Sequence, residues 1–172
     1  MELPIPKGYE SVNDAIEFSG VELLNAASSD PSAQARDLLG EGMTATESDA
    51  DSQLLLYIPF MNNVQVASIL LKVNEESQVP NRAKVWNSLP AALSFEDAES
   101  QKAPFDGAVS SVKEGWREIK LRFVLFQNVS SLLVFLDGED PDTATVLERL
   151  VIVGRKGQTR AQAPLQSLED ED

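Results

Sequence analysis

The chain has 172 residues, a length that fits one domain of ordinary size with a sizeable buried core. Its 28 acidic and 14 basic residues give a net charge of −14, which repels nucleic acid and anionic lipid and favours a partner with a neutral or basic face. There is no His and no Cys, which excludes His- and Cys-based nucleophiles, iron–sulfur ligation and the common zinc sites. An enzyme would have to use carboxylate, Lys, Tyr or Ser–Lys chemistry, or a metal held by oxygen ligands.

No apolar run approaches the ~18 residues of a membrane span, and the N-terminus lacks the pattern of a secretion signal. The absence of Cys favours an intracellular protein, and the negative charge disfavours nucleic-acid and membrane partners. We expect a monomer in the cytoplasm and nucleus. Residues 1–10 are rich in Pro and Gly and predict an extended linker. Short helices are predicted over 11–25, with Ser11 as N-cap, and around 29–42, between Asp30-Pro31 and Gly40.

From residue 53 onward the pattern changes to strands. The apolar runs 53–60 and 63–73 are separated by Met61-Asn62-Asn63, a turn-like interval that predicts a hairpin. Further strands are expected over 82–89, 118–126, 131–136 and 145–154. About six strands, few helices and turn-rich gaps predict a mainly β fold, an antiparallel β-sandwich with short N-terminal helices. We expect this domain to span 11–154 and a polar tail, ending in four acids, to span 155–172.

The stretch ESDADSQLLLYIPF places three carboxylates, Glu47, Asp49 and Asp51, directly before an apolar strand. An EF-hand counted from Asp49 would need Gly and Glu where Leu54 and Phe60 stand, so that calcium motif is excluded. A looser Ca²⁺ site, with ligands from distant loops, remains an alternative. The favoured interpretation is an acidic loop whose side chains accept backbone N–H bonds and set the start of the strand, or face a partner.

A second acidic group, Glu96, Asp97 and Glu99, is expected to form a solvated loop or a helical turn. Trp86 and Trp116 could line a groove but are expected in or beside the core. The glycines are scattered singly, so no phosphate-binding loop is predicted. No catalytic residue, resident metal or cofactor is therefore predicted.

Four segments together resemble the PITH domain family, which is found in thioredoxin-like protein 1 and in stand-alone relatives. The segments are ESDADSQLLLYIPF, LSFEDAES, LRFVLFQNVSSLLVF and LERLVIVG, and the likeness runs from about Tyr9 to Gly154. The acidic SDADSQLL and the segment FQNVSSL carry most of its specificity. IPKGY, residues 5–9, resembles the junction between a thioredoxin domain and this domain, which implies the C-terminal part of a two-domain protein.

The resemblance implies a β-sandwich of jelly-roll type and an interaction domain without catalytic residues. It further implies association with the proteasome regulatory particle near its deubiquitinating subunit, so that the domain tethers a thioredoxin there. Glu47, Asp49 and Asp51 match the family well enough to be named as a partner-binding surface. A Ca²⁺-dependent small-ligand or carbohydrate-binding jelly roll is the alternative function.

One departure from the family concerns the last strand. Relatives commonly show Thr-Thr-Arg before it, whereas this chain has Ala144-Thr145-Val146. Any contact made by that Arg is therefore lost in this protein.

Overall fold

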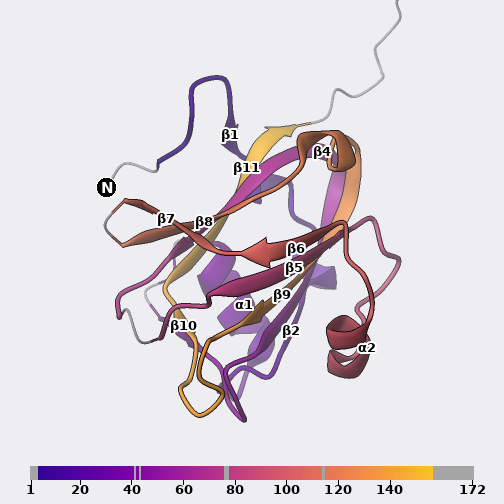
Figure 1. Ribbon diagram of the computed structural model, residues 1–172. Coiled ribbons are helices and arrows are strands. Elements are labelled where there is room, and N and C mark those ends of the chain that lie inside the picture. The colour runs from indigo at the N-terminus through magenta and orange to yellow at the C-terminus, as the bar shows by residue number, and fades with distance from the viewer. Residues whose placement is uncertain (1–3, 41, 43, 76–77, 114, 157–172) are drawn as a thin grey trace, which may run out of the picture.

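The computed structural model describes residues 4–40, 42, 44–75, 78–113 and 115–156, and most of its regular elements are antiparallel strands (Figure 1). The strands are β1 (Glu10–Ser11), β2 (Glu22–Leu24), β3 (Thr46–Glu47), β4 (Leu54–Lys72), β5 (Arg82–Asn87), β6 (Phe105–Ala108), β7 (Ser110–Lys113), β8 (Trp116–Lys120), β9 (Val129–Asp137), β10 (Val146–Leu147) and β11 (Arg149–Lys156). The α-helices are α1 (Pro31–Leu39) and α2 (Phe95–Ser100), and the 3₁₀ turns are η1 (Asn13–Ala15), η2 (Phe18–Gly20) and η4 (Phe123–Leu125).

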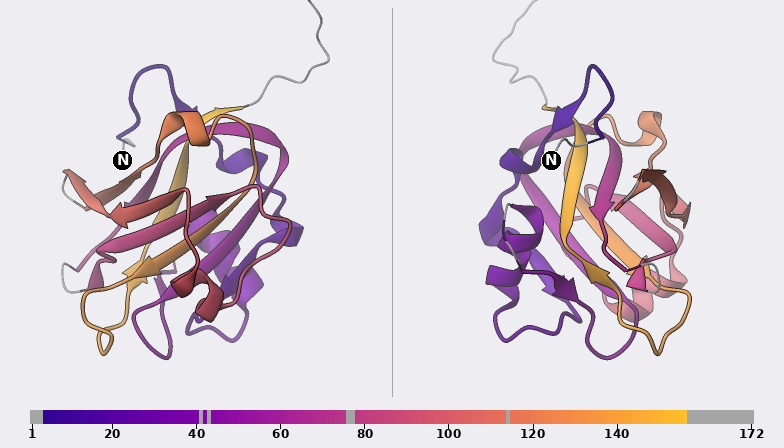
Figure 2. Two further views of the ribbon diagram at one scale, coloured as in Figure 1. Left: turned by 45° about the vertical axis from the view of Figure 1, so that its right-hand side comes forward. Right: turned by 90° about the vertical axis from the view of Figure 1, so that its left-hand side faces the viewer.

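The long strand β4 belongs to both layers of a jelly-roll-like sandwich. Its first half pairs with β2 and β9, and β5 and β6 extend that layer beyond β9. Its second half pairs with β11 and β8, and β1 and β7 extend this other layer. Figure 2 shows the two layers packed against each other, which confirms the predicted antiparallel β-sandwich.

The predicted hairpin at Met61-Asn62-Asn63 is wrong, because the chain bends there without reversing direction. The pairing of β4 with β9 shifts register between Pro59 and Val64, which marks a β-bulge. The Asn pair does favour irregular backbone. However, the two flanking segments find partners in different layers, so the irregularity becomes the corner of the sandwich.

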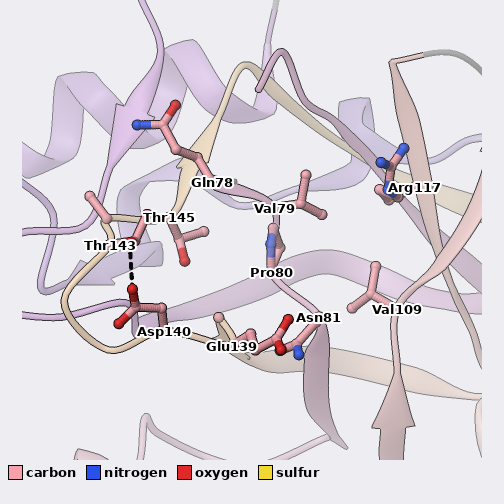
Figure 3. A pocket seen from close by; sticks show the side chains of 12 residues that line it. Gln78, Val79, Pro80, Asn81, Val109, Arg117, Glu139, Asp140, Thr143 and Thr145 are labelled. Atoms are coloured by element: carbon pink, nitrogen blue, oxygen red, sulfur yellow. Dashed lines mark hydrogen bonds between the residues drawn. The ribbon is translucent and has the colours of Figure 1, made fainter. Parts of the chain in front are cut away.

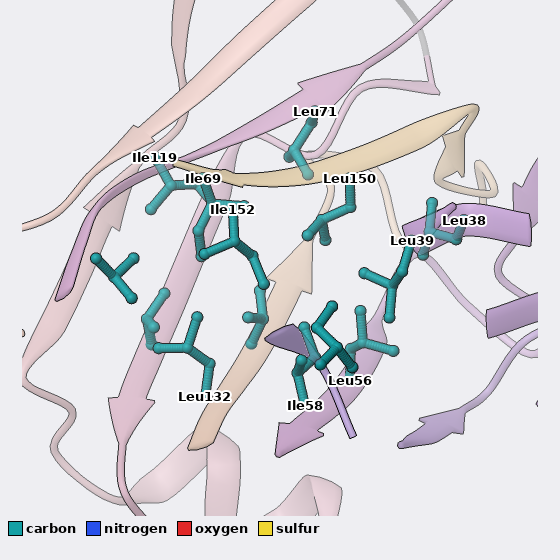
Figure 4. Close-up of a cluster of buried hydrophobic side chains, with 14 of the residues drawn as sticks. Leu38, Leu39, Leu56, Ile58, Ile69, Leu71, Ile119, Leu132, Leu150 and Ile152 are labelled. Atoms are coloured by element: carbon teal, nitrogen blue, oxygen red, sulfur yellow. The ribbon is translucent and has the colours of Figure 1, made fainter. Parts of the chain in front are cut away.

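The core lies between the layers and is almost entirely aliphatic (Figure 4). β4 supplies Leu56, Ile58 and Ile69 to it, and β11 supplies Leu150 and Ile152. Each such side chain stabilises the fold by roughly 1.5–3 kcal/mol when it is fully buried. β4 reads as apolar on both faces because Leu55 and Tyr57, on its outer face, are also buried, in a smaller cluster around Trp86.

The two tryptophans are buried outside the main core, as expected for core or core-edge residues. Trp86 packs with Leu55, Leu133 and Phe135 beside the segment that carries α2. Trp116 is 1% exposed and packs with Leu70, Val151 and Val153. The N-terminal Ile5 and Tyr9 pack against this second cluster, so part of the predicted linker contacts the domain.

Helix α1 confirms the second predicted helix. The Asp30 side chain accepts a hydrogen bond from the Ala33 amide (3.2 Å), Pro31 stands in the first turn, and Gly40 is the C-cap. The helix predicted over 11–25 is wrong: this segment forms β1, η1, η2 and β2. Its backbone bonds go to the sandwich instead, and the Val12 amide donates to the Ile152 carbonyl (2.9 Å).

The strand predicted over 118–126 is also shorter than expected, because β8 ends at Lys120 and η4 follows. β8 and β9 lie in different layers, so the chain has to cross between them in this interval. β6 and β7 were not predicted, since their residues are mostly exposed and only weakly apolar. None of the helices in the described ranges has the length and apolarity needed to cross a bilayer. Of the tail predicted over 155–172, Arg155 and Lys156 belong to β11, and residues 157–172 lie outside the described residues.

Candidate interaction surface

The acidic segment 47–51 is anchored by a short ladder to the chain before β11. β3 pairs with β10, so that Thr46 is opposite Leu147 and Glu47 is opposite Val146. Thr46 and Leu147 are fully buried, whereas Glu47 is exposed. Because alternate residues of a strand point to opposite sides, Thr46 and Leu147 point inward and the Glu47 carboxylate lies in solvent.

A chain of buried hydrogen bonds continues this ladder toward the start of β4. The Ser48 amide donates to the Thr145 carbonyl (2.8 Å), and the Thr145 amide donates to Ser48 Oγ (2.8 Å). Thr145 Oγ1 donates to the Ser52 carbonyl (2.6 Å), and Ser52 Oγ donates to Asp137 Oδ1 (2.9 Å). Because these hydroxyls are buried and satisfied, they hold the two loops in one arrangement.

Asp51 is a structural residue of the loop. Its Oδ1 accepts hydrogen bonds from the Gln53 amide (2.9 Å) and from Asn25 Nδ2 (2.9 Å). Asn25 has a left-handed backbone (φ 66°) and also binds the Gln53 carbonyl (2.7 Å) and, through Oδ1, the Ala50 amide (3.1 Å). The Asp51 carboxylate thus fixes the chain just before β4, as the structural interpretation of this segment expects.

Glu47 and Asp49 differ from Asp51, because their side chains are exposed. The Asp49 backbone amide donates to the Asn25 carbonyl (2.8 Å), which fixes the backbone and leaves the carboxylate pointing away from the core. Of the three sequence-predicted residues, these two are therefore available to a partner. Asp51 is half-buried and supports them.

A second acidic segment lies beside the first, and sequence reasoning did not connect the two. Residues 137–142 contain Asp137, Glu139, Asp140 and Asp142, and the last three are exposed. Figure 1 shows this loop between β9 and β10 next to the loop between β3 and β4, at the end of the sandwich opposite β1. We call the segments 47–51 and 137–142 the acidic loop pair. Neither segment contains a Lys or Arg.

The second predicted acidic group forms the short helix α2, as one of the two expectations for it stated. Ser94 caps the helix by accepting from the Asp97 amide (3.1 Å), and Glu96 and Asp97 lie in its exposed first turn. Glu99 is linked to the acidic loop pair through Gln53, whose Nε2 donates to Glu99 Oε2 (2.9 Å) and to Asp137 Oδ2 (3.5 Å). The described part of the chain holds no group of three or more acidic side chains placed to bind a metal ion.

A cavity of about 460 Å³ lies beside the acidic loop pair (Figure 3). Its walls come from the segment before β5, the loop between β9 and β10, and single residues near β7 and in β8. The lining residues are Gln78, Val79, Pro80, Asn81, Val109, Arg117, Gly138, Glu139, Asp140, Thr143, Ala144 and Thr145. No sequence motif marks this cavity, because its walls are brought together only by the tertiary fold.

Comparison with protein families gives a match to the PITH domain over residues 2–171. Thioredoxin-like protein 1 of Schizosaccharomyces pombe is 33% identical over 177 residues, which cover 95% of this chain and 57% of that protein. The PITH domain-containing protein CG6153 of Drosophila melanogaster is 28% identical over 115 residues, covering 65% of this chain and 51% of that protein. The chain thus spans about half the length of the curated relatives it matches. These matches support a protein-interaction domain.

Two solved structures with a similar fold come from bacterial proteins. The F5/8 type C domain of a Bacteroides fragilis protein superposes with a TM-score of 0.60 at 10% identity, covering 88% of this chain and all (100%) of that one. A family 32 carbohydrate-binding module from Clostridium perfringens NanJ, solved with galactose, gives 0.59 at 7% identity, covering 84% and 98%. At these identities the likeness concerns the jelly-roll sandwich alone.

Proposed function

This chain belongs to the PITH domain family, and we propose that it is a non-catalytic interaction domain that docks a thioredoxin-like protein onto the proteasome regulatory particle. Docking takes place near the deubiquitinating subunit of that particle, and the acidic loop pair makes the contact. The proposal includes a monomeric domain without a cofactor, in the cytoplasm and the nucleus. Light scattering checks the oligomeric state, and imaging of a tagged chain checks the location.

The observation that carries the proposal is the exposed group of carboxylates on the acidic loop pair. Glu47 and Asp49 from one loop, with Glu139, Asp140 and Asp142 from the other, face solvent on a backbone that buried hydrogen bonds hold fixed. A single-sign surface of this kind steers a basic partner and selects against acidic ones. A fixed backbone also lowers the entropy that binding has to overcome.

Retention of purified regulatory particle on the immobilised chain tests the proposal. We expect binding at low salt that weakens as the ionic strength rises, since exposed charges are screened beyond about 8 Å at physiological salt. Failure to retain the particle even at low salt would rule the proposal out. The double variant Glu47→Gln, Asp49→Asn should weaken retention by about three- to tenfold, the effect of removing two rim charges.

A matched control removes the same amount of charge elsewhere. Glu10 in β1 and Glu17 before η2 are both exposed and lie outside the acidic loop pair. The double variant Glu10→Gln, Glu17→Gln should therefore bind the regulatory particle like the unmodified chain. Equal losses in the two double variants would show that net charge alone, and not the loop pair, governs binding.

The alternative is a Ca²⁺-dependent small-ligand or carbohydrate module, motivated by the oxygen-rich segment 47–53. In the described residues the Asp51 carboxylate is already engaged by Asn25 and Gln53. Melting curves with and without millimolar Ca²⁺ decide between the two functions. A site at 100 times its Kd would add ~2.7 kcal/mol of stability.

A further inference from the structure

The cavity beside the acidic loop pair has a mostly polar lining, with an apolar patch on its floor and two carboxylates at its rim. Pro80 is buried, and Val79 and Val109 are half-buried, so together they offer a hydrophobic surface. Glu139 and Asp140 lie on the rim, both exposed, on the side formed by the loop between β9 and β10. Figure 3 shows Glu139 beside Asn81, below the floor residues. This combination suits a ligand with an apolar stem and a cationic end.

The walls of the cavity are held in place by contacts already made within the domain. Thr145, 1% exposed, donates its hydroxyl to the Ser52 carbonyl. Asp140 accepts from the Asp142 amide (2.9 Å) and from Thr143 Oγ1 (3.0 Å), which closes the loop on itself. The Asn81 amide donates to the Asp137 carbonyl (3.0 Å), so both sides of the cavity are tied to the end of β9. Fixed walls lower the ordering cost of binding, because the cavity itself does not have to rearrange.

We propose that this cavity receives one lysine or arginine side chain of the protein partner, with its stem on Val79, Pro80 and Val109 and its charge at Glu139. The inference rests on the proposed function, because it names what the partner inserts next to the acidic loop pair. An extended Lys or Arg side chain carries three or four methylene groups, and a cavity of about 460 Å³ can hold it.

Arg117 lines the other end of the cavity and limits where a cation can lie. Its Nη1 donates to the Trp116 carbonyl (3.3 Å), and its side chain is 9% exposed. Figure 3 shows it well apart from Glu139 and Asp140. The cation of the ligand is therefore expected in the half formed by the loop between β9 and β10.

Capped tripeptides with a central Arg, Lys or citrulline between two glycines test the inference on the ¹⁵N-labelled chain by NMR titration. The Arg and Lys peptides should shift the backbone amides of Asn81, Val109, Glu139, Asp140 and residues 142–145. The citrulline peptide, which has nearly the same shape without the charge, should bind about three- to tenfold more weakly. Equal binding of the citrulline peptide, or shifts confined to residues 47–51, would overturn the inference.

Two variants separate the cavity from the charged surface around it. Glu139→Gln should lower the affinity for the Arg peptide by about three- to tenfold. Asp49→Asn lies outside the cavity and should leave this affinity within about twofold of the unmodified chain. Ala144→Leu narrows the cavity and keeps every charge, and it should also lower the affinity for the Arg peptide. Unchanged melting temperatures show that the variants are folded. If Glu139→Gln and Asp49→Asn lower the affinity for the Arg peptide equally, the titration reports only nonspecific attraction between the acidic surface and the cationic peptide.

These experiments distinguish failure of the cavity inference from failure of the proposed docking function. If the regulatory particle is retained equally by Glu139→Gln and by the unmodified chain, and no peptide binds, the cavity inference fails and the docking function stands. If the particle is never retained but the Arg peptide binds in the cavity, docking to this particle fails and the cavity remains a site for basic side chains.

Discussion

Val146 lies directly opposite Glu47 in the antiparallel ladder of β3 and β10. The resemblance to the PITH family implies Thr-Thr-Arg in relatives where this chain has Ala144-Thr145-Val146, which places that Arg opposite Glu47. Opposite charges at such positions stabilise a sheet, whereas an apolar neighbour leaves the carboxylate to solvent. The departure from the family pattern thus frees Glu47 for a partner in this chain.

Restoring the Arg should reverse this effect. We expect Val146→Arg to raise the free energy of unfolding by about 0.2–1 kcal/mol, the value of an opposite-charge cross-strand pair, and to weaken retention of the regulatory particle. Urea unfolding of Val146→Arg, Glu47→Gln and the double variant measures the coupling. If Val146→Arg stabilises the Glu47→Gln background equally, the gain does not come from this pair.

Asp49 and Asp51 should separate into a binding residue and a structural residue. Asp51→Ala removes the acceptor of both the Gln53 amide and the Asn25 side chain, and should lower the free energy of unfolding by about 1–3 kcal/mol. Asp49→Asn changes only an exposed carboxylate and should stay within about 0.5 kcal/mol of the unmodified chain. Thermal melting of both variants checks this. Similar losses of unfolding free energy in the two variants would contradict this division into a binding and a structural residue.

The sequence located the first acidic loop correctly but could not show the second one beside it. Asp51, Gln53 and the start of β4 are local, so turn chemistry and the apolar run were enough to predict them. The bond between Ser48 and Thr145 joins residues 97 positions apart, and no local pattern indicates which distant loop will supply such a partner. For the same reason the cavity was not predicted, since its walls come from four separate segments.

Two of the errors in secondary structure have a related cause, because both lie where the chain changes layer. Alternating apolar residues predicted a strand through Phe123 and Leu125, yet the chain leaves β8 for the other layer there and forms η4. Asn62-Asn63 predicted a reversal, yet pairing on both sides turned it into a bulge. Local propensity cannot weigh these tertiary pairings.

Lys84 is expected to be essential for the stability of α2. It is 8% exposed, and its Nζ donates to the carbonyls of Ala98 (3.1 Å), Glu99 (2.8 Å) and Gln101 (2.9 Å) at the end of that helix. Lys84→Met keeps the stem and removes these donors, so it should cost about 1–3 kcal/mol, because the buried Ala98 carbonyl and two part-buried carbonyls lose their donor. Hydrogen exchange of the variant should speed up in α2 relative to the unmodified chain, and by more than in β11. Unchanged protection of α2 would contradict this role.

The bulge at Gly154 should tolerate no larger residue, because β4 passes directly over it. A Cβ at this position would lie 1.8 Å from the carbonyl oxygen of Gln65, and the register shift between Val153 and Gly154 leaves no other path for the backbone. Gly154→Ala should therefore cost at least ~3 kcal/mol, since backbone atoms on both strands must move. Gly107→Ala is the matched strand control: the nearest atom there, 3.3 Å away, belongs to the Phe105 ring, which can turn aside. Urea unfolding of the two variants measures the difference, and equal losses would show that the cost arises from replacing a strand glycine and not from the contact with Gln65.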